Sequence, residues 1–319
     1  MPKRLFFASL FQIGLLCADF AYPDFTVSLL REGRDLRNFE TNFISKERLD
    51  DFSSTKNLNI YRHLYARNVL HTREPSYLYR IPRIVHQIWL GSAVPPKYYD
   101  WMRTWMAWRG WEYKLWTDSD VKELTLHNQE LYDQATNYGE KSDILRLELL
   151  LQYGGIYADT DFECIRPEIF DELHRYFDFY IGFEPLTHGT IGGTYKICNA
   201  LIGSSPSHPL IKQMVTHLAD NRVAHSHQTA VEQTGPDYLS KTILAYEQAQ
   251  LQKTRREYRY RNMYLPCTFF YPFSEPEVRT AASREALLAH ITPETAAVHY
   301  WNGSWHDTTS CYSAHTQER

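Results

Sequence analysis

With 319 residues, the chain is long enough for one large domain or for a core domain with an appendage. Its formal net charge of -4 argues against nucleic-acid binding, which normally requires a basic face. The composition is that of a globular protein, with 43% hydrophobic and 23% charged residues. No apolar run reaches the roughly 18 residues that a membrane-spanning helix needs.

The N-terminus resembles a secretory signal peptide. The basic residues Lys3 and Arg4 precede the apolar stretch LFFASLFQIGLLCA, and Ala21 offers a cleavage site. Asp19 makes that cleavage site a poor one, so a short uncleaved anchor and an ordinary buried helix stay open as alternatives. We interpret residues 1–21 as a signal peptide or short anchor. This interpretation favours a secreted or membrane-associated protein, held at a membrane through its N-terminus, over a cytoplasmic one.

Residues 22–80 form a polar and charged region that predicts two or three helices and contains no obvious catalytic group. From residue 81 the pattern changes to alternating strands and helices. We predict a buried strand at 84–90, a helix at 101–111, a second strand at 113–116, and an N-cap within residues 117–120 for a helix over VKELTL. This alternation is typical of an α/β sheet.

The segment KSDILRLELLLQYGGIYADTDFE carries the most chemistry. Its first half predicts a well-buried helix that begins near Ser142 and ends at the Gly-Gly pair. Asp143 and Arg146 are three positions apart, so both lie on one face of that helix. Either they pair with each other for structural reasons or they face a polar ligand. We favour the ligand.

The second half of the segment ends an apolar strand with two carboxylates, Asp159 and Asp161. Positions i and i+2 of a strand point the same way, so we expect both to project from one face. A D-x-D triplet alone is a weak signal, but this one follows a strand, where α/β proteins bind ligands. Together the two carboxylates predict a site for Mn²⁺ or Mg²⁺ that carries a diphosphate.

The rest of the chain continues the pattern. We predict a strand at 177–184, loops near an open site within the Gly- and Ser-rich segment 187–209, two helices after it with a turn between them, and a loose tail at 307–319. Trp89 could stack on a nucleotide base or be an ordinary core tryptophan. Ser304 and Trp305 could contact the metal and diphosphate from a mobile segment, because an indole N–H is a good phosphate donor.

Several blocks together resemble one known family: IPRIVHQIWLG, YKLWTDSD, KSDILRLELLLQYGGIYADTDFEC, later HP and TGP elements, and HYWNGSWH. They are similar to the DXD sugar transferases of glycosyltransferase family 32. That family includes fungal mannosyltransferases that act on glycans or inositol phosphoceramide, and related bacterial enzymes. The blocks are more distantly similar to the glucosyltransferase domain of large clostridial toxins. The resemblance covers roughly residues 81–306 and leaves out the residues before 78.

The resemblance implies a GT-A (Rossmann-like) α/β fold, with a mixed sheet, flanking helices and the N-terminal helical region as an appendage. It also implies retention of the anomeric configuration. Asp159 and Asp161 would be the DXD pair, with Asp161 the principal ligand of Mn²⁺ or Mg²⁺. Asp143 and Arg146 would hold the hydroxyls and phosphate of the donor sugar.

For the base and the diphosphate, the resemblance implies further contacts. Trp89 would stack on uracil or guanine, with Ile88 beside it. Ser304 would contact the metal, and together with Trp305 it would close over the diphosphate. Two further residues lie close enough in sequence to join them, His299 and Asn302.

We therefore expect a retaining, metal-dependent glycosyltransferase that moves a hexose from a UDP- or GDP-sugar to a hydroxyl of a glycan, lipid or protein. Two alternatives keep the same site. A hydrolase would use water as the acceptor, and an inactive module would only bind sugar or nucleotide.

Overall fold

A computed structural model of the chain describes residues 21–31, 34–35, 56–73, 76–191, 194–253 and 260–303. The predicted tail, Ser304 and Trp305 lie outside these residues, as does the predicted signal or anchor segment apart from Ala21. None of the helices within the described ranges is both long enough and apolar enough to cross a membrane.

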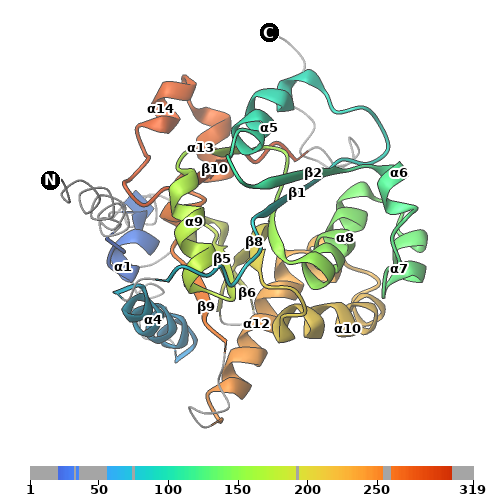
Figure 1. Cartoon of the computed structure of the whole chain (residues 1–319), viewed down its shortest axis with the longest axis horizontal. Helices are drawn as coiled ribbons and strands as arrows, with labels where there is room; N and C mark the ends of the chain where they lie inside the picture. The colour runs from blue at the N-terminus through green and yellow to red at the C-terminus, as the bar shows by residue number, and fades with distance from the viewer. Residues whose placement is uncertain are drawn as a thin grey trace, which may run out of the picture.

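Six strands form a mixed sheet at the centre of the structure: β1 (Ile84–Ile88), β2 (Glu112–Trp116), β3 (Gly155–Ala158), β5 (Phe179–Phe183), β8 (Ile197–Ser204) and β9 (Asn262–Leu265). Their order is β2-β1-β3-β8-β5-β9 (Figure 1). β8 runs antiparallel to both of its neighbours, and the other pairs are parallel. The carboxyl ends of all strands except β8 therefore lie at one edge, where β8 begins.

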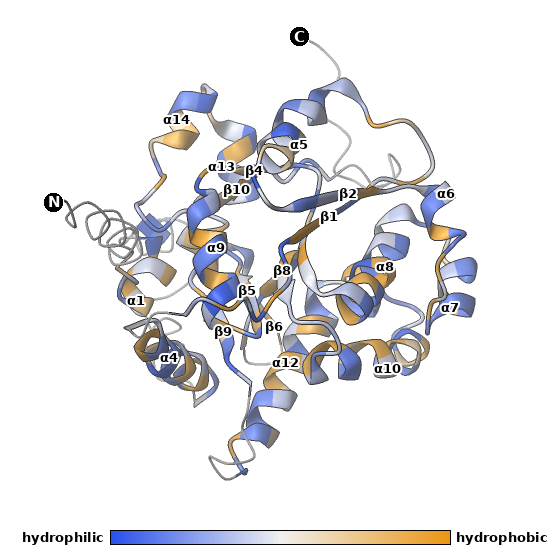
Figure 2. Cartoon of the chain, in the orientation of Figure 1, coloured by the Kyte–Doolittle hydropathy of each residue, from blue (hydrophilic) through white to orange (hydrophobic). Residues whose placement is uncertain are grey.

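Helices cover both faces of this sheet. On one face, α8 (Tyr138–Tyr153) and α12 (Pro236–Gln250) pack on the strands and on α10 (Pro209–Ala224). On the other face lie α9 (Pro167–Tyr176) and α5 (Tyr99–Met106), where Phe170 of α9 contacts Trp105 of α5 and Tyr180 of β5. Figure 2 shows hydrophobic residues along the central strands and on parts of α8, whereas α7 (Gln129–Gln134) is largely hydrophilic. The predicted α/β class, with a mixed sheet and flanking helices, is confirmed.

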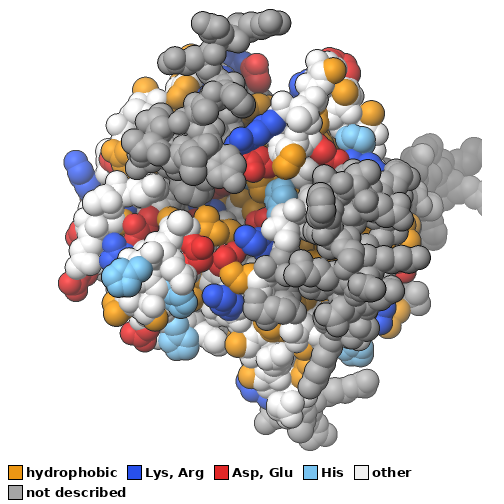
Figure 3. All heavy atoms as spheres, turned by 180° about the vertical axis from the view of Figure 1, so that it is seen from behind, with side chains coloured by type: hydrophobic (Ala, Val, Ile, Leu, Met, Phe, Trp, Pro, Cys, Tyr) orange, Lys and Arg blue, Asp and Glu red, His pale blue; other side chains and the backbone are white. Residues whose placement is uncertain are grey.

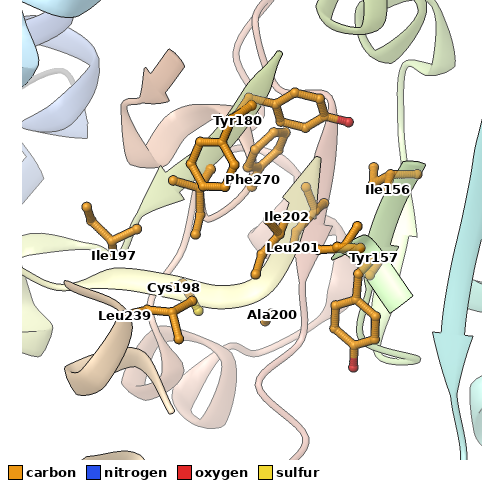
Figure 4. Close-up of a cluster of buried hydrophobic side chains, with 14 of the residues drawn as sticks. Ile156, Tyr157, Tyr180, Ile197, Cys198, Ala200, Leu201, Ile202, Leu239 and Phe270 are labelled. Carbon is orange, nitrogen blue, oxygen red and sulfur yellow. The ribbon is translucent and has the colours of Figure 1, made fainter. Parts of the chain in front are cut away.

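Consecutive residues of β3 lie on opposite faces of the sheet. Ile156 and Tyr157 point to opposite sides of the sheet (Figure 4). Ile156 pairs with Gly203 of β8, and Gly203 in turn pairs with Tyr180. A Cβ atom at Gly203 would lie 2.1 Å from the Tyr180 ring, so only glycine leaves room for that ring. Tyr157 is left to face α8.

The helix that carries Asp143 is α8, and its start differs from the prediction. It begins at Tyr138 rather than near Ser142, because Asn137 caps it by accepting hydrogen bonds from the backbone N–H groups of Gly139 and Glu140. Its end at Gly154 agrees with the prediction, since this glycine adopts a φ of 64°. Ser142 therefore lies inside the helix.

One other predicted boundary was wrong, and one strand was missed. The helix predicted at 101–111 ends at Met106. The Gly- and Ser-rich segment 187–209 contains the long central strand β8, which is buried throughout and was not predicted. The N-cap predicted within residues 117–120 lies at Thr117, which forms a capping box with Asp120, but the helix that it begins is α6 (Asp118–Val121) and not VKELTL.

The N-terminal region contributes α1 (Phe25–Leu29), α4 (Lys56–Val69) and the 3₁₀ turn η2 (Leu70–Arg73). α4 packs along the edge strand β9, and α1 packs on α4 and on η5 (Cys267–Phe269). Buried Arg31 pairs with Asp35 and Glu277, which ties this region to α13 (Glu275–Thr280). The N-terminal helices thus share the core of the sheet.

The remaining elements are short. They are η3 (Pro96–Tyr98), β4 (Phe162–Cys164), η4 (Leu186–His188), β6 (Thr190–Ile191), β7 (Thr194–Tyr195), α11 (Ala230–Gln233), α14 (Arg284–Leu288) and β10 (Ala297–His299). β10 pairs with β4 in a two-stranded sheet of its own, and this pairing brings the C-terminal segment to the edge where β3 ends.

Candidate active site

A cavity of about 420 Å³ opens at the edge where β1, β3 and β5 end. In the space-filling view from behind, acidic, basic and histidine side chains gather at the centre of the molecule (Figure 3). The cavity brings together seven of the predicted site residues, namely Ile88, Trp89, Asp143, Arg146, Asp159, Asp161 and His299. Residues that were not predicted complete the lining, among them Glu184, Asn199 and Glu275.

The two aspartates of the D-x-D triplet reach the cavity in a different way from the one expected. β3 ends at Ala158, so Asp159 and Asp161 lie in the turn between β3 and β4 and not on a strand face. The Asp159 N–H bonds to the carbonyl of Ala200 at 2.8 Å, and the Asp159 carbonyl accepts from the Phe162 N–H at 3.2 Å. The predicted position of both residues on a strand face was therefore wrong, but the turn still places both carboxylates in one cavity.

Asp159, Asp161 and His299 form a cluster whose potential ligand atoms lie within 4.8 Å of one another. His299 Nε2 is 3.1 Å from Asp161 Oδ1, and the backbone N–H of Asn302 donates to Asp161 Oδ2 at 2.7 Å. Within the described residues, the buried Nδ1 of His299 has no hydrogen-bond partner. Two carboxylates and an imidazole are a donor set that fits Mn²⁺, and Mg²⁺ through the carboxylates.

Burial and charge set the protonation of this cluster. Burial favours the neutral form of Asp161, but His299 and the Asn302 N–H stabilise the carboxylate and hold its pKa below the ordinary value. Burial also opposes a charge on His299, yet the neighbouring Asp161 raises the pKa of that imidazole. For Asp159, burial raises the pKa, and Arg146 opposes the rise.

Asp143 is almost fully buried and held on both oxygens. Its Oδ1 accepts from the Asn199 side-chain amide at 2.7 Å, and its Oδ2 accepts from the Thr234 hydroxyl at 2.9 Å. Arg146 Nη2 lies 3.1 Å from Oδ1. Burial raises the pKa of Asp143 to about 6, against the opposing effects of Arg146 and Thr234. Asp143 and Arg146 therefore pair with each other and also line the cavity.

Arg146 connects the helix to the D-x-D turn. Its Nη1 donates to the Asn199 carbonyl at 2.7 Å and lies 3.5 Å from Asp159 Oδ1. The guanidinium lies over the Tyr157 ring at 4.5 Å, and the Tyr157 hydroxyl donates to Asp159. Ser142 also contacts Tyr157, at 3.1 Å between the two hydroxyl oxygens. A cation is thus fixed beside the carboxylates by contacts that leave one side of it to the cavity.

Trp89 lines the cavity directly after β1 and is only half-buried, unlike a core tryptophan. Its ring packs against Tyr98 at 4.8 Å, and its indole N–H donates to Ser92 at 3.2 Å. Ile88 lies beside it in the cavity wall. Asn302 joins the site through its backbone N–H, whereas the placement of Ser304 and Trp305 stays a prediction.

Sequence reasoning missed Tyr157, Asn199, Thr234 and Glu184. Tyr157 is two residues before Asp159, which is a usable signal, and Thr234 belongs to the TGP element. Asn199 and Glu184 carried no signal, because nothing near them in sequence indicates that they meet Asp143 or the cavity.

Comparison with known proteins agrees with this site. Residues 97–178 match the family model described as "Glycosyltransferase sugar-binding region containing DXD motif". This segment contains Asp143, Arg146, Asp159 and Asp161. The predicted resemblance to DXD sugar transferases is confirmed over these residues, and relatives that the chain is similar to are named mannosyltransferases.

The curated relatives include inositol phosphoceramide mannosyltransferases from Schizosaccharomyces pombe. Inositol phosphoceramide mannosyltransferase 3 is 30% identical over 50% of this chain and 44% of its own length. Inositol phosphoceramide mannosyltransferase 1 is 26% identical over 55% of both chains. The chain therefore spans about half the length of the curated relatives it matches. Among solved structures, a chain titled "PaToxG Glycosyltransferase" is 17% identical over 65% of this chain and 86% of its own, with a TM-score of 0.42.

Proposed function

We propose that this chain, whose residues 97–178 belong to the DXD sugar-transferase family, is a retaining, metal-dependent glycosyltransferase. It would move a hexose from a UDP- or GDP-sugar to a hydroxyl group. The observation that carries the proposal is the cluster of Asp159, Asp161 and His299, with Arg146 beside it, in a cavity lined by Trp89.

The charge of the cavity supports the need for a metal. Five carboxylates line it, from Asp143, Asp159, Asp161, Glu184 and Glu275, against one guanidinium. A diphosphate would be repelled by this excess of negative charge. A divalent ion held by Asp159, Asp161 and His299 would offset the charge of the two aspartates and act as a Lewis acid toward the leaving diphosphate.

Side chains of the cavity can bind each part of the donor. Trp89 offers a face for the base, a contact worth about 1–3 kcal/mol in nucleotide binding. Arg146 supplies a fixed positive charge for the phosphate or sugar. Asp143 accepts hydrogen bonds from sugar hydroxyls, and Asn199 and Thr234 orient it for this task.

Retention is proposed on the family resemblance. In a front-face displacement the acceptor oxygen attacks the anomeric carbon from the side that the diphosphate leaves, and no covalent intermediate with the protein is needed. Arg146 is placed to stabilise the charge that develops on the diphosphate as the bond breaks.

The names of the relatives guide the proposal for the sugar and the acceptor. The relatives named inositol phosphoceramide mannosyltransferases favour mannose as the sugar and a lipid-linked hydroxyl as the acceptor. A glycan or protein hydroxyl would use the same chemistry.

A panel of nucleotide sugars tests the proposal. Purified protein is incubated with GDP-mannose, UDP-glucose, UDP-galactose or UDP-N-acetylglucosamine, with Mn²⁺ or with a chelator. We expect one donor to raise the melting temperature and to be turned over only with the metal, and a transferred sugar to keep its anomeric configuration by NMR. Hydrolysis that no hydroxyl acceptor diminishes would indicate a hydrolase, and binding without turnover would indicate an inactive module.

A further inference from the structure

The carboxylate of Glu184 lines the cavity but has no role in donor binding in the proposed function. Glu184 is the first residue after β5 and is 8% exposed, yet it lines the cavity. Burial alone would raise its pKa, but a hydrogen bond from His188 and the charge of Lys196 hold the pKa of Glu184 below the ordinary value. An ionised carboxylate in a buried wall needs partners for its oxygens.

His188 fixes the position of this carboxylate. Its Nδ1 lies 3.0 Å from Glu184 Oε2, and its Nε2 accepts from the backbone N–H of Glu275 at 3.3 Å. Because a backbone N–H can only donate, the ring proton is on Nδ1, and His188 donates it to Glu184. The neighbouring Cys198 thiol also lowers the pKa of Glu184. An ionised carboxylate has about four acceptor positions, so it keeps capacity for a ligand hydroxyl.

Glu184 lies close to the proposed reacting centre. The His188 ring contacts Trp301 at 4.7 Å, and Trp301 contacts His299 of the metal cluster at 4.3 Å. The negative charge of Glu184 is felt at His299, where it adds to the effect of Asp161 in raising the pKa. The carboxylate is therefore near the cluster but bound to a different set of residues.

The chemistry of the two substrates indicates which group could bind to Glu184. A carboxylate repels the diphosphate, and the sugar hydroxyls already have Asp143. The second substrate presents a hydroxyl, which is a hydrogen-bond donor. Resting on the proposed function, we infer that Glu184 is a further catalytic residue that accepts a hydrogen bond from the attacking acceptor hydroxyl, and that His188 is its positioning residue.

In the reaction, the bond between the anomeric carbon and the diphosphate oxygen breaks, and its electron pair leaves with the diphosphate. The acceptor oxygen forms the new bond to the anomeric carbon, and the hydroxyl proton, hydrogen-bonded to Glu184 before the attack, passes by way of that carboxylate to the leaving diphosphate. Glu184 gains no proton overall. By accepting the hydrogen bond, it orients the hydroxyl so that a lone pair of the oxygen points at the anomeric carbon. This orientation lowers the barrier to the reaction.

Hydrolysis of the donor tests this role of Glu184 without an identified acceptor, because water then takes the place of the acceptor hydroxyl. For the donor found in the panel, Glu184→Gln should lower kcat of hydrolysis about 10–100-fold, the effect of losing a hydrogen bond to a charged group. The dissociation constants of the nucleotide sugar and of the nucleoside diphosphate, each measured with Mn²⁺, should stay within about two-fold. In Glu184→Ala, added formate should restore part of kcat, because a small carboxylate can enter the vacated space.

Glu247→Gln is the matched control. Glu247 is fully buried and accepts from Asn262 and Tyr264, but it does not line the cavity. Its replacement should lower the melting temperature and leave kcat unchanged. If Glu184→Gln weakens binding of the nucleotide sugar but not binding of the nucleoside diphosphate, Glu184 contacts the donor sugar and the inference is overturned. An unchanged kcat, or a loss that formate does not relieve, would also overturn it. A wild-type protein that turns over no nucleotide sugar would instead refute the proposed function.

Discussion

The imidazole of His299 lies against the carboxylate of Asp161, with 3.1 Å between Nε2 and Oδ1. These residues are 138 positions apart and meet because β10 pairs with β4, where His299 is directly opposite Phe162. The backbone N–H of Asn302 then donates to the other oxygen of Asp161. One carboxylate of the D-x-D turn is thus oriented by a segment from the end of the chain, as metal ligands are commonly oriented by their neighbours.

We expect Asp161→Asn to lower metal-dependent turnover by about 100-fold or more, because a neutral amide cannot offset the charge of the ion or place it against the diphosphate. His299→Ala should weaken Mn²⁺ binding at least about 10-fold. Both effects are measured as the Mn²⁺ dependence of donor hydrolysis and of the melting temperature. Glu163→Gln is the control, since Glu163 pairs with half-exposed Arg284 instead of the cluster. Wild-type turnover in Asp161→Asn would contradict the metal assignment.

Removal of the hydroxyl that supports Asp143 should change the pH profile. Thr234 donates to the ionised form of Asp143, so Thr234→Val should raise the pKa of Asp143 further above its value of about 6. Because we propose that the ionised form binds the sugar, hydrolysis rises with pH through this pKa, and the acid limb should move to higher pH. Thr234→Ser keeps the hydroxyl and should keep the wild-type profile. Identical acid limbs in all three proteins would exclude this role.

Replacement of the cavity tryptophan should act on nucleotide affinity alone. We expect Trp89→Ala to weaken UDP or GDP binding about 10–100-fold, as loss of a base-stacking contact does, and Trp89→Phe to recover most of it. Titration calorimetry with Mn²⁺ measures both. Trp111→Ala removes an indole that packs on His174 outside the cavity and serves as the control. Equal losses in Trp89→Ala and Trp111→Ala would point to a structural effect.

Buried histidines predict lower stability in acid. Burial lowers the pKa of His86 to about 4, and of His174 and His208 to about 3. As the pH falls below about 6.5, each imidazole binds a proton in the unfolded chain but not in the folded one. The free energy of unfolding should therefore fall by about 1 kcal/mol per pH unit for each histidine. Urea unfolding between pH 6.5 and 5 measures this slope.

The same experiment has an internal comparison. His208→Gln should remove about a third of the slope due to the three histidines, whereas replacement of the exposed His217 should leave it unchanged. A slope that is the same in His208→Gln and the wild-type protein would mean that His208 does not resist protonation in the folded state.

Several local features could be predicted from the sequence because they depend on neighbouring residues. The apolar run before Trp89 forms β1, Thr117 caps α6, and Gly154 ends α8. The start of α8 was placed too late because the capping signal of Asn137 was not recognised. β8 was missed because its buried residues are flanked by Gly- and Ser-rich sequence typical of loops.

For the candidate site, the sequence alone determined the D-x-D pair and the Asp143–Arg146 pair, because each lies within one short segment whose residues are close by chain geometry. Only the tertiary structure decided their partners. Thr234 bonds to Asp143 across 91 residues, and His299 bonds to Asp161 across 138. Such contacts depend on the register of strands and the packing of helices on a shared core, and no local pattern of residues specifies these.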